Sequence, residues 1–452
     1  MKNISLKIKN FGVSIILLFL CFVGGEVTLS YVIGPRGDQI APYPADNLVV
    51  AYQVSDLSKK PFLSRIIRAG YYSIGVNTFR KYDLHTSTRH FDQLHLKVYD
   101  QGALSYLSYI ENSGWIPVSP SKIHFRSIPH VNPLNNQYTF INGFPFTTQP
   151  GEIFTGFAFD VDQNTGEVIA ILTTGYGALP NILETRFYLG KKTVQANAFS
   201  WQYVGTAPNG FAGGVIETVY DASSKRMNIM YSEYNIVAGM PYSEIVVDTN
   251  TAQMVQAPVS VTGYRVNRGG NNTVLPARSY NAKQAIFIDF PSFVFQGIYF
   301  SEKNAGTAQW TAQSLSPQGY YADMLAYPSG ASASNIFFAV AENPQISWSK
   351  LPDRITGYRR DSNGNWITFP IQTTQMSYGG SFDVPSRLNP DTTTASRYDL
   401  VIASEIYDSS KPSLPMSLQL LLGHTSNLNT FTTRTLESVD FLYGLQTEWI
   451  KS

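Results

Sequence analysis

The sequence is poor in cysteine and in charge. Its 452 residues include a single cysteine, Cys21, and only 14% are charged, against roughly 25% in an average soluble domain. One cysteine near the N-terminus excludes a disulfide framework for the remainder of the chain. The 33 basic and 32 acidic residues form no long runs of one sign, so the chain lacks the footprint of a nucleic-acid-binding protein. Bulk charge therefore does not select the partner.

Long hydrophobic runs are also scarce, and the one clear example lies near the N-terminus. Three lysines in the first nine residues precede the apolar stretch 11–25, FGVSIILLFLCFVGG. A positive segment followed by an apolar segment of this length is typical of a signal peptide. Residues 1–25 are therefore predicted to be a signal peptide cut before Glu26, or an uncleaved signal-anchor that provides the only membrane contact. Either form places the protein outside the cytoplasm, secreted or at the cell envelope or surface.

Aromatic and turn-forming residues are abundant instead. The chain has 28 Tyr, 27 Phe, 34 Gly and 25 Pro. Aromatic side chains suit the half-buried face of a sheet, and Gly and Pro suit tight turns. This composition predicts an all-β protein of many short strands.

A hairpin pattern recurs along the chain. A short strand ending in Tyr or Phe before Asp or Asn is followed by a polar turn and an alternating apolar strand, as in LHLKVYDQGALSYLSYIE at 94–111. Copies begin near residues 47, 94, 156, 213, 274, 324 and 382, the first being reduced to NLVVAYQVSD. Between copies lies a second hairpin whose last strand is predicted to begin near a tryptophan; these are Trp115, Trp201, Trp310 and Trp366.

Two hairpins in each unit predict a β-propeller of about seven four-stranded blades over residues 47–452. Six or eight blades would also fit the spacing. Residues 26–46 are then a linker or, through the alternating stretch 26–34, a strand that closes the ring. The alternative is a pair of β-sandwiches, because strand spacing alone does not separate the two folds.

The blades resemble those of the sialidase-type propellers that carry Asp-box repeats. The segment SEKNAGTAQW at 301–310 resembles a stretched, degraded form of that family's S-x-D-x-G-x-T-W hairpin, and FRSIP at 125–129 is similar to its F/Y-R-I-P motif with Ser127 inserted. The resemblance implies that Arg126 holds a substrate carboxylate. It also implies further arginines and an acid, for which Arg278 and Glu217 are the available innermost-strand residues. The more common role of Arg126 is that of an ordinary arginine on a surface strand.

A set of acids closes the second strand in several copies; these are Glu111, Glu233, Asp289, Glu342 and Glu405. In equivalent blades they would form a ring at one level, able to bind a cation or a polyhydroxylated ligand. The favoured alternative is a solvated rim or a set of salt bridges between blades.

Two other groups of residues resemble metal sites only loosely. Five of the six histidines fall within residues 85–130, but their spacing gives no preformed ligand pair on one strand face. A zinc or copper site assembled across two loops is the alternative to ordinary polar surface. The string DVDQNTGE at 160–167 departs from the calcium-loop pattern and is predicted to be a hairpin turn. The sequence therefore predicts no metal and no other cofactor, and it does not support Ca²⁺.

The function favoured by the sequence is an extracellular or surface binding module for carbohydrate. Tyrosine and tryptophan rings stack on sugar faces, and amide or carboxyl groups satisfy the hydroxyls. The alternatives are a sialidase-like glycoside hydrolase and an adhesin or scaffold that binds an extracellular protein. No catalytic motif appears in the chain, so the sequence leaves open whether the protein is an enzyme. The ligand, the host and the oligomeric state are not determined by the sequence.

Overall fold

A computed structural model describes most of the chain between residues 47 and 451, and it consists of strands and turns there. The described residues are 47–56, 64–112, 122–130, 133, 136–141, 152–178, 181–207, 214–232, 242–261, 279–292, 295–316, 319–329, 333–342, 353–360, 364–373, 382–390, 398–407 and 416–451. They form seven four-stranded antiparallel sheets, the blades of a β-propeller.

The first three blades along the chain use strands from residue 47 to residue 207 and one strand from the C-terminal end. The strand bounds of the first blade are β28 (Phe441–Ile450), β1 (Asn47–Asp56), β2 (Ser64–Ser73) and β3 (Thr78–Ser87). Those of the second are β4 (His90–Tyr99), β5 (Leu104–Asn112), β6 (Lys122–Pro129) and β7 (Gln137–Ile141). Those of the third are β8 (Ile153–Val161), β9 (Val168–Ala178), β10 (Asn181–Lys192) and β11 (Ser200–Ala207).

The other four blades follow in simple chain order. The strand bounds of the fourth are β12 (Val215–Asp221), β13 (Arg226–Ser232), β14 (Tyr242–Asp248) and β15 (Gln253–Ser260). Those of the fifth are β16 (Ser279–Tyr280), β17 (Gln284–Ser292), β18 (Phe295–Lys303) and β19 (Trp310–Ser316). Those of the sixth are β20 (Gly319–Ser329), β21 (Ala333–Glu342), β22 (Arg354–Arg360) and β23 (Trp366–Thr373). Those of the seventh are β24 (Phe382–Asp383), β25 (Leu400–Tyr407), β26 (Met416–His424) and β27 (Asn427–Val439).

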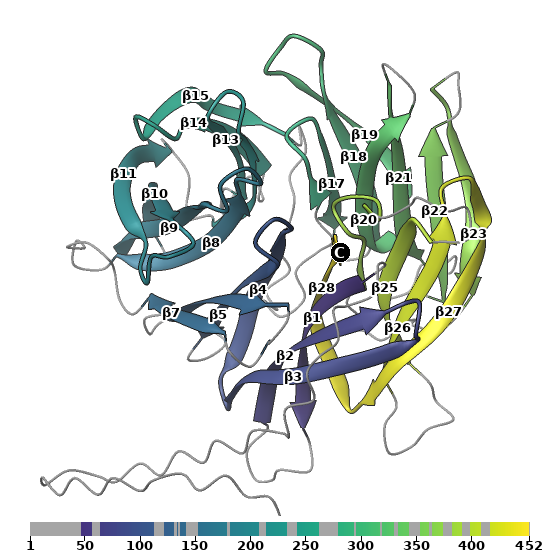
Figure 1. The fold of residues 1–452 in the computed structure, drawn as a ribbon. Coiled ribbons are helices and arrows are strands. Elements are labelled where there is room, and N and C mark those ends of the chain that lie inside the picture. The colour runs from purple at the N-terminus through teal and green to yellow at the C-terminus, as the bar shows by residue number, and fades with distance from the viewer. Residues whose placement is uncertain are drawn as a thin grey trace, which may run out of the picture. The chain divides into compact units, whose positions relative to one another are not determined.

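In each blade, the strand whose bounds are given first above is the innermost one. These inner strands form a closed ring (Figure 1). Each inner strand contacts the next around the ring, in the order β28, β4, β8, β12, β16, β20, β24 and back to β28. Closure of this ring leaves no unpaired sheet edge at its start or end. The arrangement confirms the predicted seven-bladed propeller and excludes the pair of β-sandwiches.

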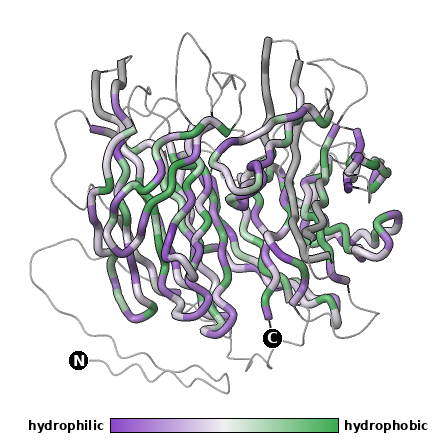
Figure 2. Tube along the Cα trace, turned by 90° about the horizontal axis from the view of Figure 1, so that it is seen from above, coloured by the Kyte–Doolittle hydropathy of each residue, from purple (hydrophilic) through white to green (hydrophobic). Residues whose placement is uncertain are grey.

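The hairpin pattern explains where the strands lie. Predicted copies at 94–111 and 156–172 are the first two strands of the second and third blades, β4–β5 and β8–β9. The turns between strands hold positive-φ residues such as Asn77, Ala103 and Gly166, which reverse the chain direction within a few residues. Figure 2 shows hydrophobic and hydrophilic residues following one another along the strands. That alternation is expected when side chains point to opposite sheet faces.

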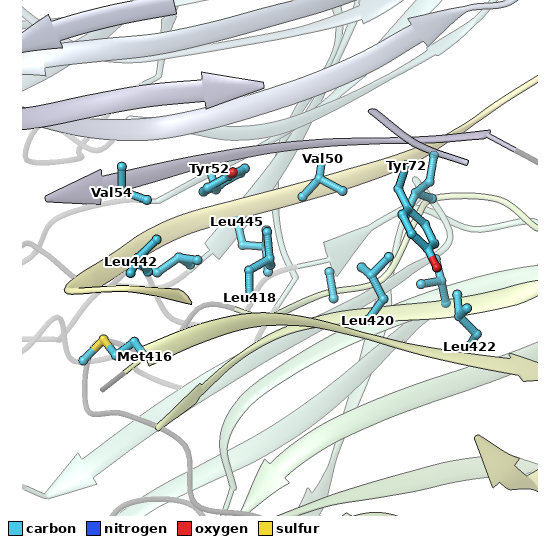
Figure 3. Close-up of a cluster of buried hydrophobic side chains, with 14 of the residues drawn as sticks. Val50, Tyr52, Val54, Tyr72, Met416, Leu418, Leu420, Leu422, Leu442 and Leu445 are labelled. Carbon is cyan, nitrogen blue, oxygen red and sulfur yellow. The ribbon is translucent and has the colours of Figure 1, made fainter. Parts of the chain in front are cut away.

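Strand β28 closes the ring by pairing with β1, so the first blade combines both ends of the propeller. The core between this blade and the seventh contains Val50, Leu418, Leu442 and Leu445, all with at most 4% of their surface exposed (Figure 3). Burial of such side chains stabilises the fold by about 1.5–3 kcal/mol each. The reduced first copy, NLVVAYQVSD, is β1, a second strand whose inner neighbour comes from the C-terminal end. The stretch 26–34, predicted as a closing strand, lies outside the described residues.

One detail of the predicted repeat is wrong. Trp201, Trp310 and Trp366 each stand at or next to the start of an outermost strand, in β11, β19 and β23. Trp115 precedes β6, a third strand, and the outermost strand of its blade is β7. Trp115 itself lies outside the described residues.

In the part of the chain that the structure describes, no helix is both long and apolar enough to span a membrane. The predicted signal peptide or anchor, residues 1–25, lies outside that part.

Candidate functional site

Charged side chains from four blades interact inside the ring of inner strands. We call His95, Lys97, Asp160, Glu217 and Glu448 the axial cluster. His95 and Lys97 lie two residues apart on β4, so both point to the same side of that strand. The Lys97 Nζ atom lies 3.3 Å from Glu217 Oε1, and His95 Nδ1 lies 3.7 Å from Glu217 Oε2. Because β8 separates β4 from β12 in the ring, this ion pair bridges two blades that are not neighbours.

Close packing of the inner strands positions Glu217. A Cβ atom added at Gly156 on β8 would lie 2.7 Å from the backbone of Val215, so only glycine permits this approach of β12. Glu217 follows two residues after Val215. Its side chain and that of Lys97 retain 19% and 20% of their surface exposed. The pair is therefore shielded but keeps part of its surface exposed.

The charges of the axial cluster compensate one another. Burial alone would raise the pKa of Glu217, but the Lys97 ammonium and the nearby His95 imidazole lower it to about 2. Burial would lower the pKa of Lys97, but the carboxylates of Glu217, Asp160 and Glu448 raise it above its ordinary value. Glu217 and Lys97 are therefore both ionised at neutral pH.

Two other carboxyls of the axial cluster tie neighbouring inner strands together. Asp160 accepts hydrogen bonds from the backbone N–H groups of Val161 and of Tyr220 on β12. Glu448 on β28 accepts one from the backbone of Ser386, just after β24. Burial raises the pKa of both carboxyls, and Lys97 offsets part of that rise. They serve at least in part as structural links between blades.

A second group of side chains lies between the first and second blades. We call His85 on β3, Glu111 on β5 and His124 on β6 the histidine cluster. Each offers one nitrogen or oxygen ligand atom, and the three atoms lie within 4.8 Å of one another. The His124 Nε2 atom is 3.1 Å from Glu111 Oε2, and Ser87 Oγ donates a hydrogen bond to Glu111 Oε1.

Tyrosine hydroxyls orient both imidazoles of the histidine cluster. The His124 Nδ1 atom lies 2.6 Å from the Tyr138 hydroxyl, and His85 Nδ1 lies 3.2 Å from that of Tyr109. The Tyr109 ring stacks on His124 with centroids 4.8 Å apart, because the two residues are directly opposite in the β5–β6 register. Glu111, two residues beyond Tyr109, points to the same face.

Burial sets the protonation of the histidine cluster. It lowers the pKa of His85, and burial together with the charge of His85 lowers that of His124 to about 4. Burial would raise the pKa of Glu111, but the Ser87 hydrogen bond and His124 hold it below its usual value. At neutral pH the cluster therefore holds two neutral imidazoles and one carboxylate.

Arg126, predicted to hold a substrate carboxylate, lies on the third strand β6 rather than on an inner strand. Its guanidinium donates hydrogen bonds to the Tyr109 hydroxyl, to Asn136 Oδ1 and to the carbonyl of Leu84, and it lies over the Tyr138 ring. These contacts hold Arg126 beside the histidine cluster. The structure brings Glu217 to the inner ring, as predicted, but does not bring Arg126 there with it. Arg278 lies outside the described residues.

The predicted ring of acids is built differently from blade to blade. Glu111 and Glu342 both close second strands and are both buried, and Glu405 is fully buried on β25. Glu111 bonds across two blades, whereas Glu342 accepts hydrogen bonds from Thr356, Arg354 and Tyr358 of its own blade. Asp289 lies on β17, and Glu233 lies outside the described residues. Glu111, Glu342 and Glu405 are thus buried, and the printed hydrogen bonds of Glu111 and Glu342 differ in whether they cross between blades.

The segment 160–167 forms a hairpin turn between β8 and β9, as predicted. The Asp162 side chain caps the turn by accepting the N–H of Asn164, and Gly166 adopts a φ of 73°. Asp160 points instead toward β12. The acids of this segment do not converge on one point.

Sequence reasoning missed Lys97, His95 and the convergence of His85 with His124. The first pair belongs to the copy LHLKVYD, whose alternation indicated only a strand. The convergence of His124 with Glu111 could be predicted once the strands of the blade were assigned. The β5–β6 pairing sets Tyr109 opposite His124, and Glu111 lies two residues along β5 from Tyr109. The contribution of His85 comes from another blade and leaves no local signal.

Comparison with known proteins shows likeness in fold alone. No family model matches the chain, and no curated protein matches it. Among solved structures, a Synechocystis ACO mutant is 9% identical with a TM-score of 0.48, covering 92% of this chain and 94% of that one. A Trypanosoma rangeli sialidase is 9% identical with a TM-score of 0.40, covering 76% and 56%. A Fusarium graminearum α-L-arabinofuranosidase is 10% identical with a TM-score of 0.39, covering 78% and 96%. The resemblance to sialidase-type propellers is one of fold.

Proposed function

We propose that the protein is an exported propeller that binds carbohydrate through the axial cluster. The observation that carries this proposal is the partly exposed Lys97–Glu217 pair inside the ring, joined by His95. An ammonium donates hydrogen bonds and a carboxylate accepts them, and sugar hydroxyls do both. A pre-organised pair of this kind, shielded from bulk water, suits a polyhydroxylated ligand of low charge.

Binding is favoured over hydrolysis because the carboxyls are already engaged. A glycoside hydrolase uses one protonated and one ionised carboxyl, roughly 5–9.5 Å apart, on either side of the scissile bond. The two carboxyl oxygens of Asp160 accept hydrogen bonds from two backbone N–H groups. Glu448 accepts a hydrogen bond from the backbone N–H of Ser386. Proton transfer by either would break a contact between inner strands.

Hydrolysis is nevertheless the second candidate, and one observation favours it. The pKa of Glu217 is lowered to about 2, while burial raises the pKa of Asp160 in the same charge network. Environments that push two carboxyl pKa values apart are the usual basis of acid and base roles in an active site.

The test is a glycan array probed with the purified full-length protein and read both for retained protein and for loss of printed sugar. We expect selective retention on one glycan class and no loss of sugar. The double variant Lys97→Met/Glu217→Gln, which removes both charges together, should abolish retention. Glu342→Gln, a buried glutamate of another blade, is the matched control and should bind normally. An array with no retained protein contradicts the carbohydrate proposal, and loss of sugar replaces binding by hydrolysis.

Export is the second part of the proposal, supported by the lysines and the apolar stretch of residues 1–25. Mass spectrometry of the N-terminus of protein recovered outside the cytoplasm tests it. A mature chain that starts at Glu26 identifies a cleaved signal peptide, and an intact N-terminus in the membrane fraction identifies an anchor. Recovery only from the cytoplasm contradicts export.

A protein partner is less supported by the described residues. Their exposed large apolar side chains lie on one turn and on four different strands; they are Val76, Tyr138, Tyr203, Val255 and Ile367.

A further inference from the structure

We propose that His85, Glu111 and His124 form a binding site for a divalent transition metal that links the first two blades. Two imidazoles and a carboxylate are the ligand set that Zn²⁺ and its first-row neighbours take when one or more positions remain open for water or substrate. Among the residues that the structure describes, this is the one group of three ligating side chains whose ligand atoms converge. The site is separate from the axial cluster and does not depend on carbohydrate binding.

The geometry of the histidine cluster is close to that of a bound site. Ligand bonds of about 2.0–2.2 Å place tetrahedral ligand atoms roughly 3.3–3.6 Å apart. The His124 Nε2 and Glu111 Oε2 atoms, 3.1 Å apart, are already near that separation. The widest separation among the three ligand atoms is 4.8 Å, so a movement of about 1 Å by one side chain closes the set. His85 is half-buried, so burial restricts its side chain less than those of Glu111 and His124.

The surrounding contacts match those that orient metal ligands in known sites. A ligating histidine usually bonds through its other ring nitrogen, and this bond fixes the ring orientation. Here the Tyr138 hydroxyl engages Nδ1 of His124, and the Tyr109 hydroxyl engages Nδ1 of His85. Nε2 is thus the ligating atom on each ring. When the metal binds Nε2 of His124, the ring proton lies on Nδ1. This N–H then donates a hydrogen bond to the Tyr138 hydroxyl oxygen.

Protonation and local charge have opposite effects on affinity. Both imidazoles are neutral and Glu111 is ionised at neutral pH, so metal binding releases no proton to solvent. The His124 ring proton has only to move from Nε2, where it faces Glu111, to Nδ1. Arg126 and Lys122 lie close enough to oppose a cation electrostatically. One carboxylate against two such cations predicts weaker binding than that of a four-ligand structural zinc site.

The test uses the full-length chain stripped with a chelator and titrated with ZnCl₂ by calorimetry, followed by Co²⁺ absorption spectroscopy. We expect one Zn²⁺ per chain and a Co²⁺ ligand-field band. Glu111→Gln and His124→Gln should each weaken Zn²⁺ binding by at least about tenfold and remove the band. His85→Gln, the least buried of the three changes, should do the same with the smallest effect on folding.

Two control variants keep the result interpretable. Glu342→Gln changes a buried glutamate at the equivalent end of a second strand, and His130→Gln changes a buried histidine outside the cluster. Both should bind one Zn²⁺ with unchanged affinity. The proposal is overturned if the wild-type protein does not bind one Zn²⁺ per chain. It is also overturned if the His85→Gln variant, shown to be folded by circular dichroism, binds as tightly as wild type.

Discussion

The axial cluster and the histidine cluster lie in the same propeller but solve the burial of polar groups differently. In the axial cluster, a lysine from β4 faces carboxyls from β8, β12 and β28, and the charges of Lys97 and Glu217 hold each other ionised. In the histidine cluster, burial keeps the imidazoles neutral and leaves one carboxylate as the only ion of the three. The first arrangement balances its charges internally, whereas the second combines neutral nitrogen groups with one carboxylate, the groups that ligate a metal cation.

The difference follows from position in the blade. Inner strands of several blades approach one common space, so a single long side chain such as Lys97 can serve carboxyls from different sheets. Toward the outer strands, only two blades are in reach, and His85 meets Glu111 and His124 across one interface. Fewer partners are available there, and shorter, neutral groups are the less costly residues to bury.

The largest effect is expected from breaking the axial cluster on one side. Lys97→Met leaves the carboxylate of Glu217 without its cation, and we expect the free energy of unfolding to fall by about 3–5 kcal/mol. Urea denaturation at neutral pH measures it. The double variant Lys97→Met/Glu217→Gln should recover part of the loss, because no uncompensated ion stays behind. Equal free energies of unfolding for wild type and Lys97→Met would contradict this prediction, because the loss of the Lys97 cation would then not destabilise the fold.

The pH dependence of the free energy of unfolding distinguishes the buried imidazole of His130 from the carboxylate of Glu217. Burial lowers the pKa of His130 to about 4, with Asp100 opposing and Arg387 reinforcing the shift. The unfolded chain therefore binds this proton more readily, so the stability contributed by His130 is full above about pH 6.5 and is lost as pH falls through 4. Glu217, with its pKa lowered to about 2, loses its contribution only below about pH 4.5.

We expect His130→Gln to reduce the loss of stability between pH 6.5 and 4, by up to about 3 kcal/mol. Denaturant unfolding at several pH values measures the difference from wild type. Glutamine keeps a hydrogen bond to Ser105 Oγ available, so the comparison isolates the charge. Parallel pH profiles for the two proteins would contradict a buried neutral His130.

Smaller effects distinguish two glutamates in equivalent positions. Without metal, Glu111→Gln and Glu342→Gln should each cost about 2 kcal/mol, because each weakens hydrogen bonds to a buried carboxylate. Thermal unfolding with added ZnCl₂ then sharpens the comparison. Zn²⁺ should raise the Tm of Glu342→Gln as it does that of wild type, and it should leave Glu111→Gln unchanged.

The smallest effect is expected at the rim of the histidine cluster. Tyr138→Phe removes the hydroxyl that engages His124 Nδ1, and the ring is 44% exposed. A partly solvated hydrogen bond of this kind is worth about 0.5–1 kcal/mol. Chemical denaturation should resolve this loss, together with a weaker Zn²⁺ affinity. A loss larger than that of Glu111→Gln would mean that the tyrosine, rather than the carboxylate, organises the cluster.

The blade repeat could be predicted from sequence because each blade contains its own signal. A strand, a turn and an alternating strand lie within about twenty residues of one another, and hydrophobic alternation is the primary signal for strands. The closing strand could not be predicted in this way. The segment FLYGLQTEWI at 441–450 pairs with β1, which lies almost the whole chain away, and no local turn links the two.

The candidate sites were predictable only where one strand sufficed. Glu217 was placed on an inner strand because its copy of the hairpin fixes the order of strands. Its partner Lys97 comes from another blade, and the distance between them depends on how the blades pack around the ring. Arg126 was linked to sialidases through the FRSIP motif, but three hydrogen bonds hold it on a third strand. Motif letters do not report which strand of a blade carries them.

The pairing of β28 with β1 has a consequence for how the protein is made. A chain synthesised from its N-terminus presents β1, β2 and β3 first. Their inner strand, β28, begins only about 350 residues after β3 ends at Ser87. Until then β1 offers an open edge and an unfilled apolar face. Contacts between such distant segments are slow to form because loop closure must precede them. Any factor that protects the nascent protein from aggregation is therefore needed most at the three strands that are made first.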